Sequence, residues 1–77
     1  MFITRIRLNN EEDVGNVCSL FTSISYDIDI SCGKYLINGK SLLGLLMFLN
    51  KDLDVYGTCY PQECIELKNK LTKWEIE

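Results

Sequence analysis

The sequence contains no histidine, and this absence limits its chemistry more than any other feature of its composition. Without an imidazole the chain has no histidine general base, no histidine metal ligand and no residue able to carry phosphohistidine. Basic residues are also scarce, because 8 Lys and Arg face 11 Asp and Glu, for a formal net charge of −3. A nucleic-acid-binding protein needs a clustered basic surface to neutralise phosphates, so we expect no nucleic-acid partner.

Long hydrophobic runs and targeting signals are missing as well. The longest apolar run, residues 42–49, is interrupted only by Gly44 and is far shorter than the roughly 20 residues that span a bilayer. Residues 2–8 alternate between polar and apolar side chains and include Arg5 and Arg7, unlike the apolar region of a signal peptide. We therefore expect a single cytoplasmic domain over residues 1–77 and no membrane partner.

Cysteine is present, but not in a metal-binding arrangement. The four cysteines, Cys18, Cys32, Cys59 and Cys64, include no Cys-x-x-Cys pair, and without histidine a zinc site would need all four thiolates. The count also allows two disulfides, with three alternative pairings. Because Cys18, Cys32 and Cys64 fall in phase with apolar neighbours, we favour reduced core cysteines and expect neither a metal nor a cofactor.

The spacing of apolar residues predicts four elements in the first half of the chain. The even-numbered residues of a first strand share one face, namely Phe2, Thr4, Ile6 and Leu8. A helix with an apolar stripe follows over residues 11–25. Alternation then predicts strands over residues 26–32 and 35–37, and the short turn between them requires an antiparallel hairpin.

The second half begins with Ser41, which stands directly before the apolar run. It is a natural N-cap for a helix over residues 42–49, with Asn50 as its stop. Alternation predicts a fourth strand from residue 53, and Pro61 suits the first position of a last helix. The expected buried stripe of that helix consists of Cys64, Leu67, Leu71 and Trp74.

The element order β-α-β-β-α-β-α predicts an α+β fold. We expect an open-faced two-layer sandwich, in which a four-stranded, mostly antiparallel sheet carries three helices on one face.

The stretch from residue 26 to residue 46 resembles a known family. Tyr26-Asp27-Ile28-Asp29-Ile30, Gly33-Lys34 and Ile37-Asn38-Gly39-Lys40-Ser41-Leu42-Leu43-Gly44-Leu45-Leu46 resemble the second strand, hairpin and second-helix start of the histidine-containing phosphocarrier (HPr) family of the bacterial sugar phosphotransferase system. The element order matches that family over essentially the whole chain. The resemblance implies the HPr fold and a role related to the phosphotransferase system.

The phosphoryl chemistry of the family does not carry over to this sequence. The position of the family's carrier histidine falls on Glu12, and the Ala-Arg-Pro that follows it falls on Asp13, Val14 and Gly15. Glu11, Glu12 and Asp13 are three consecutive carboxylates. They repel phosphate, and they already occupy the positive end of the helix dipole. We therefore expect a protein that is not an enzyme, with an acyl phosphate on Glu12 as the less favoured alternative.

One family position is retained at Ser41. The resemblance implies that a dedicated kinase phosphorylates this serine, and that the modified protein then binds a transcription regulator. A phosphate there gains N–H donors and a favourable helix dipole. The alternative is that Ser41 is only a helix N-cap, which is worth about 1 kcal/mol by itself.

The apolar second helix indicates a partner surface. If Leu45, Phe48 and Leu49 face the sheet, the outward side chains are Leu42, Leu43, Leu46 and Met47, with Lys34 and Lys40 as a polar rim. Family members dock partners on the corresponding face, so the resemblance implies a regulatory module that binds a regulator, a kinase or a phosphotransferase component. The alternatives are burial under the flanking loops and a homodimer, the latter as a structural protein without a phosphotransferase role.

Overall fold

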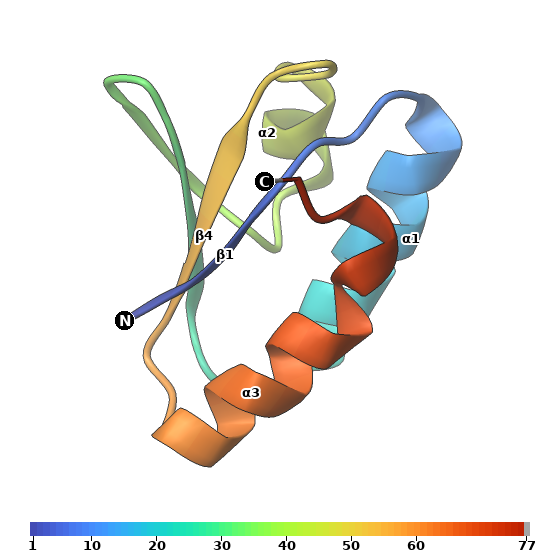
Figure 1. Ribbon diagram of the computed structural model, residues 1–77. Coiled ribbons are helices and arrows are strands. Elements are labelled where there is room, and N and C mark those ends of the chain that lie inside the picture. The colour runs from blue at the N-terminus through green and yellow to red at the C-terminus, as the bar shows by residue number, and fades with distance from the viewer. Residues whose placement is uncertain (77) are drawn as a thin grey trace.

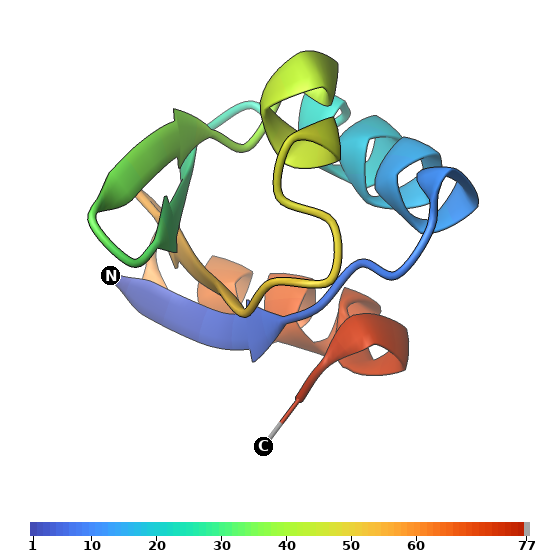
Figure 2. The same ribbon diagram turned by 90° about the horizontal axis from the view of Figure 1, so that it is seen from above.

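The computed structural model describes residues 1–76, and its elements follow the predicted order. They are β1 (Phe2–Ile6), α1 (Glu11–Thr22), β2 (Ile28–Cys32), β3 (Tyr35–Asn38), α2 (Leu42–Leu46), β4 (Leu53–Gly57), α3 (Pro61–Lys70) and a 3₁₀ turn (Thr72–Trp74). The sheet order is β1-β4-β2-β3, with every neighbouring pair antiparallel. Figures 1 and 2 show the three helices gathered on one face of the sheet, which confirms the α+β open-faced sandwich.

The core lies between the sheet and the helices. Phe21 from α1, Leu45 from α2 and Val55 from β4 are completely buried. α1 begins where the Asn10 side chain accepts the backbone N–H of Asp13 at 2.8 Å. It ends at Thr22, earlier than predicted. Within residues 1–76, no helix is both long enough and apolar enough to cross a bilayer.

α3 follows the prediction more closely. It begins at Pro61, and its buried side chains include Cys64 and Leu67, with Leu71 buried just beyond its end. Trp74 is only half-buried, because the chain tightens into the 3₁₀ turn before reaching it. The tighter turn rotates Trp74 away from the α-helical stripe on which it was expected.

β1 departs from strict alternation at a β-bulge. Phe2 lies opposite Tyr56 and Thr4 opposite Val55, so Ile3 is an extra residue on this strand. Ile3 and Thr4 are both buried, at 6% and 5% exposed, whereas Phe2 is 52% exposed. The expectation that Phe2 and Thr4 share a face was therefore wrong. On the outer face the ring of Phe2 instead packs edge-on against Tyr56, with 5.6 Å between centroids.

α2 is shorter than predicted. It ends at Leu46, and residues 47–50 continue as turns. The N–H groups of Phe48 and Lys51 bond to carbonyls three residues back instead of four. Asn50 then adopts a left-handed φ of 63°, and its N–H donates to the carbonyl of Leu8 at 2.8 Å. The prediction that the helix runs to Leu49 and stops at Asn50 was therefore wrong, because α2 is already capped at Met47 and Asn50 ends the turns that follow it.

Cys59 and Cys64 form a disulfide, which corrects the expectation that all four cysteines are reduced. Cys18 is buried and free, and Cys32 is half-buried and free. Cys64 is buried as expected, at 7% exposed, but it is also covalently paired. Hydrophobic periodicity describes each cysteine separately, so it gave no sign of the pairing.

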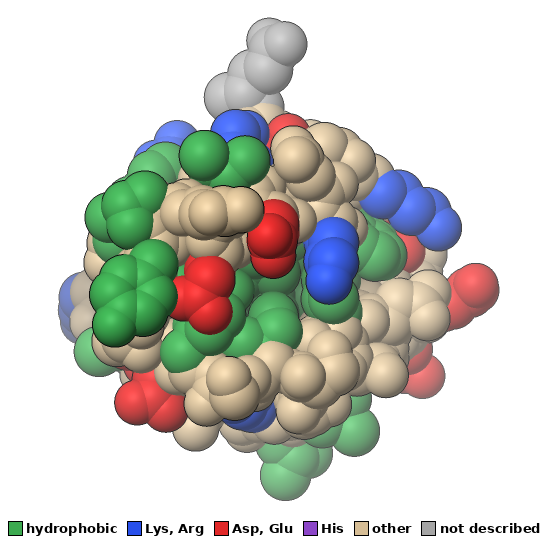
Figure 3. Space-filling view, turned by 90° about the horizontal axis from the view of Figure 1, so that it is seen from below, with side chains coloured by type: hydrophobic (Ala, Val, Ile, Leu, Met, Phe, Trp, Pro, Cys, Tyr) green, Lys and Arg blue, Asp and Glu red, His purple; other side chains and the backbone are tan. Residues whose placement is uncertain are grey.

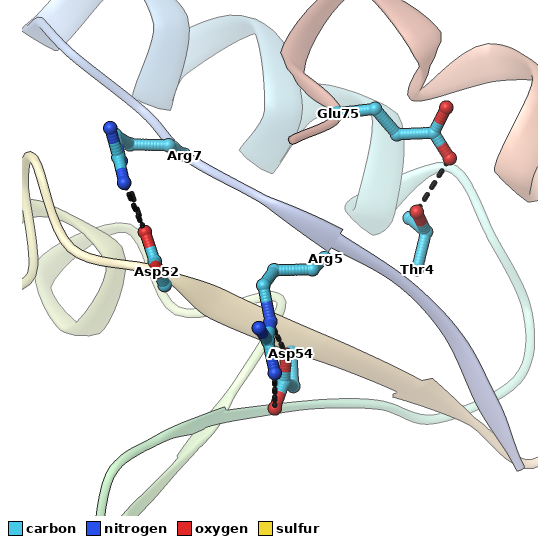
Figure 4. Close-up of polar contacts among 6 residues, drawn as sticks. All are labelled: Thr4, Arg5, Arg7, Asp52, Asp54 and Glu75. Atoms are coloured by element: carbon cyan, nitrogen blue, oxygen red, sulfur yellow. Dashed lines mark hydrogen bonds and ion pairs between the residues drawn. The ribbon is translucent and has the colours of Figure 1, made fainter. Parts of the chain in front are cut away.

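Two ion pairs link β1 to β4 and the residue just after β1 to the residue just before β4 (Figure 4). Arg5 pairs with Asp54 at 2.6 Å, and Arg7 pairs with Asp52 at 2.5 Å. The hydrogen bond from Arg5 to Asp54 raises the pKa of this guanidinium. Both pairs are partly exposed, so their main effect is on the register of the strand, and each adds little stability.

The C-terminal segment runs along the outer edge of β1. The N–H of Arg7 donates to the carbonyl of Trp74 at 3.0 Å, and the N–H of Ile76 donates to the carbonyl of Arg5 at 3.0 Å. Between these two bonds, Glu75 forms an isolated antiparallel bridge with Ile6. This segment therefore covers the part of the sheet edge that follows Thr4.

Candidate partner-binding surface

Ser41 begins α2 as an N-cap, as predicted. Its Oγ accepts the backbone N–H of Gly44 at 3.2 Å, and its carbonyl accepts the N–H of Leu45 at 3.1 Å. The N–H of Ser41 donates to the carbonyl of Asn38 at 3.0 Å, which fixes the cap to the end of β3. Ser41 is half-buried, so its side chain lies at the border between the core and the surface.

The side chains of α2 divide into an outward and an inward group. Leu43 and Met47 are 74% and 78% exposed, and Leu42 is 50% exposed. Leu45 is fully buried. Leu46, which was expected to point outward, is half-buried and packs against the core instead. A short helix whose outward residues are large and apolar leaves contiguous hydrophobic surface in water.

β3 extends this surface in a way that the sequence pattern did not indicate. Tyr35 is 56% exposed, and its ring lies 5.6 Å from that of Phe48, which follows α2. Lys34 places its ammonium 5.8 Å from the ring of Tyr35. Tyr35 directly follows the Gly33-Lys34 turn, and this position at a hairpin end was the available signal for its exposure. Below, the term α2 surface means Leu42, Leu43, Met47 and Tyr35.

Lys40 has a different position from the one expected for a polar rim. Its Nζ donates to the carbonyl of Ile24 at 2.6 Å, beyond the last turn of α1. Its backbone N–H donates to Oδ1 of Asn38 at 2.9 Å. A cation beside the carbonyl end of a helix is electrostatically favourable. Lys40 therefore ties α2 to α1 as well as standing next to Ser41.

Glu12 and Ser41 lie toward different ends of α1. Glu12 is exposed in the first turn of α1, whereas Lys40, which precedes Ser41, contacts Cys18 and the carbonyl of Ile24 toward the other end of that helix. A hollow of ≈ 200 Å³ near this end of α1 is lined by Asp13 and Trp74, among others, but not by Glu12. Trp74 Nε1 donates to Asp13 at 3.2 Å, which gives Asp13 a structural partner. The structure does not bring Ser41 and Glu12 together.

The predicted positions present an exposed apolar surface beside the Ser41 hydroxyl. Within residues 1–76, no three His, Cys, Asp or Glu side chains are grouped so that they could hold a metal ion. Ser41 offers one hydroxyl, and the α2 surface offers exposed apolar side chains. What this geometry supports chemically is docking and modification of a hydroxyl.

The comparison with solved structures agrees with this fold. A crystal structure described as HPr-C-His from Thermoanaerobacter tengcongensis superposes with a TM-score of 0.68 at 13% identity, over 95% of this chain and 86% of that one. No family model matches the sequence, and no curated protein matches it. At this identity the superposition concerns architecture alone, and on that basis the chain has an HPr-like fold.

Proposed function

We propose that this chain is a non-catalytic regulatory module with an HPr-like fold, which binds a protein partner through the α2 surface and carries no phosphohistidine. The missing histidine excludes the carrier reaction on chemical grounds. The chain has the sheet and helix arrangement of an HPr-like fold, and it exposes large hydrophobic side chains on that fold. The protein acts, in this proposal, by contact and not by turnover.

The observation that carries the proposal is the exposure of Leu43 and Met47, at 74% and 78%. These side chains lie four residues apart, so they project from one side of the helix. Large apolar residues that remain in water are stabilised when a partner covers them, and such clusters form the energetic centre of many interfaces. Tyr35 adds an aromatic side chain at the border.

Charge indicates what kind of partner fits this surface. From Ile30 to Lys51 the chain has three lysines and no acidic residue, whereas the rest has five basic and eleven acidic side chains. The α2 surface therefore belongs to the basic part of an acidic protein. We infer a partner that presents apolar side chains flanked by carboxylates, because complementary charge speeds encounter and selects the partner.

Ser41 is the proposed point of control. It immediately precedes Leu42 and Leu43 of the α2 surface. A phosphate on its Oγ would add nearly two negative charges beside a surface that accepts carboxylates. Phosphorylation is therefore expected to weaken the binding of an acidic partner, which is the reverse of the effect that the family resemblance implies for this serine.

The first test is modification of Ser41. The purified protein is incubated with ATP and a serine kinase that acts on HPr proteins, and intact mass and peptide fragments are measured. We expect one added phosphate on Ser41 and none in the Ser41→Ala variant. Phosphate on another residue, or on none, contradicts control at Ser41.

The second test is partner capture with matched variants. Leu43→Asp places a charge in the α2 surface, and Ile65→Asp makes the same change at a 61% exposed position on α3. We expect binding partners quantified by mass spectrometry to be lost at least tenfold with Leu43→Asp and retained with Ile65→Asp. Equal capture by both variants contradicts the proposal. A dimer in light scattering that dissociates with Leu43→Asp would assign the surface to a second copy of the chain.

A further inference from the structure

The disulfide joins two elements at the end of the molecule where β4 passes into α3. Cys59 follows β4 and is half-buried, and Cys64 is 7% exposed within α3. Their Cα atoms are 6.0 Å apart, within the range that a disulfide spans without moving the backbone. The four residues between them include Pro61, which starts α3, and Tyr60, which is 80% exposed.

The backbone around this pair is shaped to accommodate it. Gly57 ends β4, and a Cβ there would lie only 3.0 Å from Sγ of Cys59 and 2.8 Å from Cδ1 of Ile3. A side chain at Gly57 would therefore displace the sulfur of Cys59. The other two cysteines lie elsewhere, Cys18 on α1 and Cys32 on β2, and both are free. Of the four cysteines, only Cys59 and Cys64 form a disulfide within the described residues.

The two cysteines differ in burial, because Cys59 is half-buried and Cys64 is 7% exposed. Tyr60, Pro61 and Gln62 are exposed, so the loop that the disulfide closes faces solvent. Cys59 is partly buried against the core, whereas Cys64 is itself one of the buried core residues. An incoming thiol therefore reaches Sγ of Cys59 before that of Cys64.

We propose that Cys59 and Cys64 form a reversible thiol–disulfide exchange site whose reaction partner is a dithiol reductant. A thiolate of the reductant attacks Sγ of Cys59, the Cys59–Cys64 bond breaks, and the electron pair leaves on Sγ of Cys64, which takes up a proton. In the mixed disulfide, one sulfur of the reductant is bonded to Sγ of Cys59. The reductant's second thiol attacks that reductant sulfur, and Cys59 leaves as a thiolate that takes up a proton. Two electrons and two protons enter this chain, and the reductant becomes a disulfide.

Reduction of the disulfide would change the surroundings of a nearby recess. A hollow of ≈ 190 Å³ is lined by Tyr26, Glu63, Glu66 and Leu67, and Glu63 belongs to the loop between the two cysteines. Figure 3 looks onto this end of the molecule and shows acidic and basic side chains around a hydrophobic floor. Breaking the disulfide removes the covalent link between α3, which supplies Glu63, Glu66 and Leu67 to the recess, and the chain that follows β4. The site lies at the opposite end of the molecule from α2 and is independent of the proposed partner surface (Figure 1).

The test counts thiols by mass. Protein purified without reductant is denatured, alkylated with iodoacetamide and weighed, before and after treatment with dithiothreitol. We expect alkylation of Cys18 and Cys32 alone before treatment and of all four cysteines afterwards, with peptide mapping showing a Cys59–Cys64 link. Removal of dithiothreitol in air should restore the first pattern. Four alkylated cysteines before treatment, or a disulfide that involves Cys18, Cys32 or a second chain, overturns the proposal.

A second measurement tests which sulfur is attacked. In a Cys18→Ser, Cys32→Ser background, Cys64→Ser leaves only Cys59, and Cys59→Ser leaves only Cys64. We expect the single thiol of Cys59 to react with an aromatic disulfide reagent about tenfold faster than that of Cys64, because reactivity follows exposure. Circular dichroism confirms that both variants are folded. Equal rates, or a faster Cys64, contradict attack at Cys59.

Discussion

Single residues in this chain often hold together elements that are distant in sequence. Thr4, the buried polar side chain of β1, donates its hydroxyl to Glu75 at 2.5 Å (Figure 4). Lys68 of α3 pairs with the same carboxylate oxygen. A buried hydroxyl without an acceptor would be costly, so Glu75 allows Thr4 to lie inside. Thr4 points inward in phase with Ile6, and Glu75 supplies the partner that this position requires.

Glu75 leads to a prediction about pH. The hydrogen bonds from Lys68 and Thr4 lower the pKa of Glu75 from its usual value of 4.5. A carboxyl group with a lowered pKa in the folded state stabilises the fold above its unfolded pKa, and this contribution disappears as pH falls through the folded pKa. We expect the free energy of unfolding to fall below about pH 4.5 in the wild type and to fall less in Glu75→Gln.

Urea denaturation at a series of pH values measures this difference. Glu11→Gln is the matched control, because Glu11 is an exposed carboxylate at the start of α1. An identical acid dependence in wild type and Glu75→Gln would show that the contacts of Glu75 are not formed in solution.

Elements show where sequence patterns are reliable and where they fail. The cap at Ser41 and the helix start at Pro61 could be predicted because capping is local chemistry, and the structure confirms both, as it confirms the start of α1 at residue 11. The end of α2 and the bulge in β1 could not, because they depend on contacts from far along the chain. Asn50 donates to Leu8, and the bulge adjusts β1 to β4.

α2 supplies a matched pair of leucines that separates packing from surface function. Leu45 is fully buried and Leu43 is 74% exposed, on the same five-residue helix. Truncation of a buried leucine costs about 2–5 kcal/mol, whereas an exposed one costs less than about 0.5 kcal/mol. We expect Leu45→Ala to destabilise the protein strongly and Leu43→Ala to leave its stability unchanged, as measured by urea denaturation. A large loss of stability in Leu43→Ala would mean that Leu43 packs into the fold.

At the scale of the whole molecule, the element order was sufficient to predict the architecture. The sheet order β1-β4-β2-β3 was not specified, because alternation defines strands and not their neighbours. The candidate site was foreseen in part, since Ser41, Leu43 and Met47 lie as expected. The inward turn of Leu46, the contribution of Tyr35 and the disulfide depend on three-dimensional packing that periodicity does not encode.

The disulfide affects the stability of the entire fold. It closes a short loop between Cys59 and Cys64, so the loss of entropy in the unfolded chain is modest and corresponds to about 2 kcal/mol. In a domain of this size such a change lowers Tm by on the order of 10 °C. We expect thermal unfolding with and without dithiothreitol to differ by this amount. The Cys59→Ser, Cys64→Ser variant should not respond to the reductant, and a response there would place the effect elsewhere.

The segment that runs beside β1 limits how this protein can associate. Through Trp74 and Ile76 it occupies backbone groups of the sheet edge that another chain would otherwise use. At the other edge, β3 is a short strand next to the α2 surface. Growth into a fibre requires a strand docking site at both sides of every copy. A sheet with part of one edge already occupied favours joining a single neighbour, so assembly through its strands is expected to end with a pair.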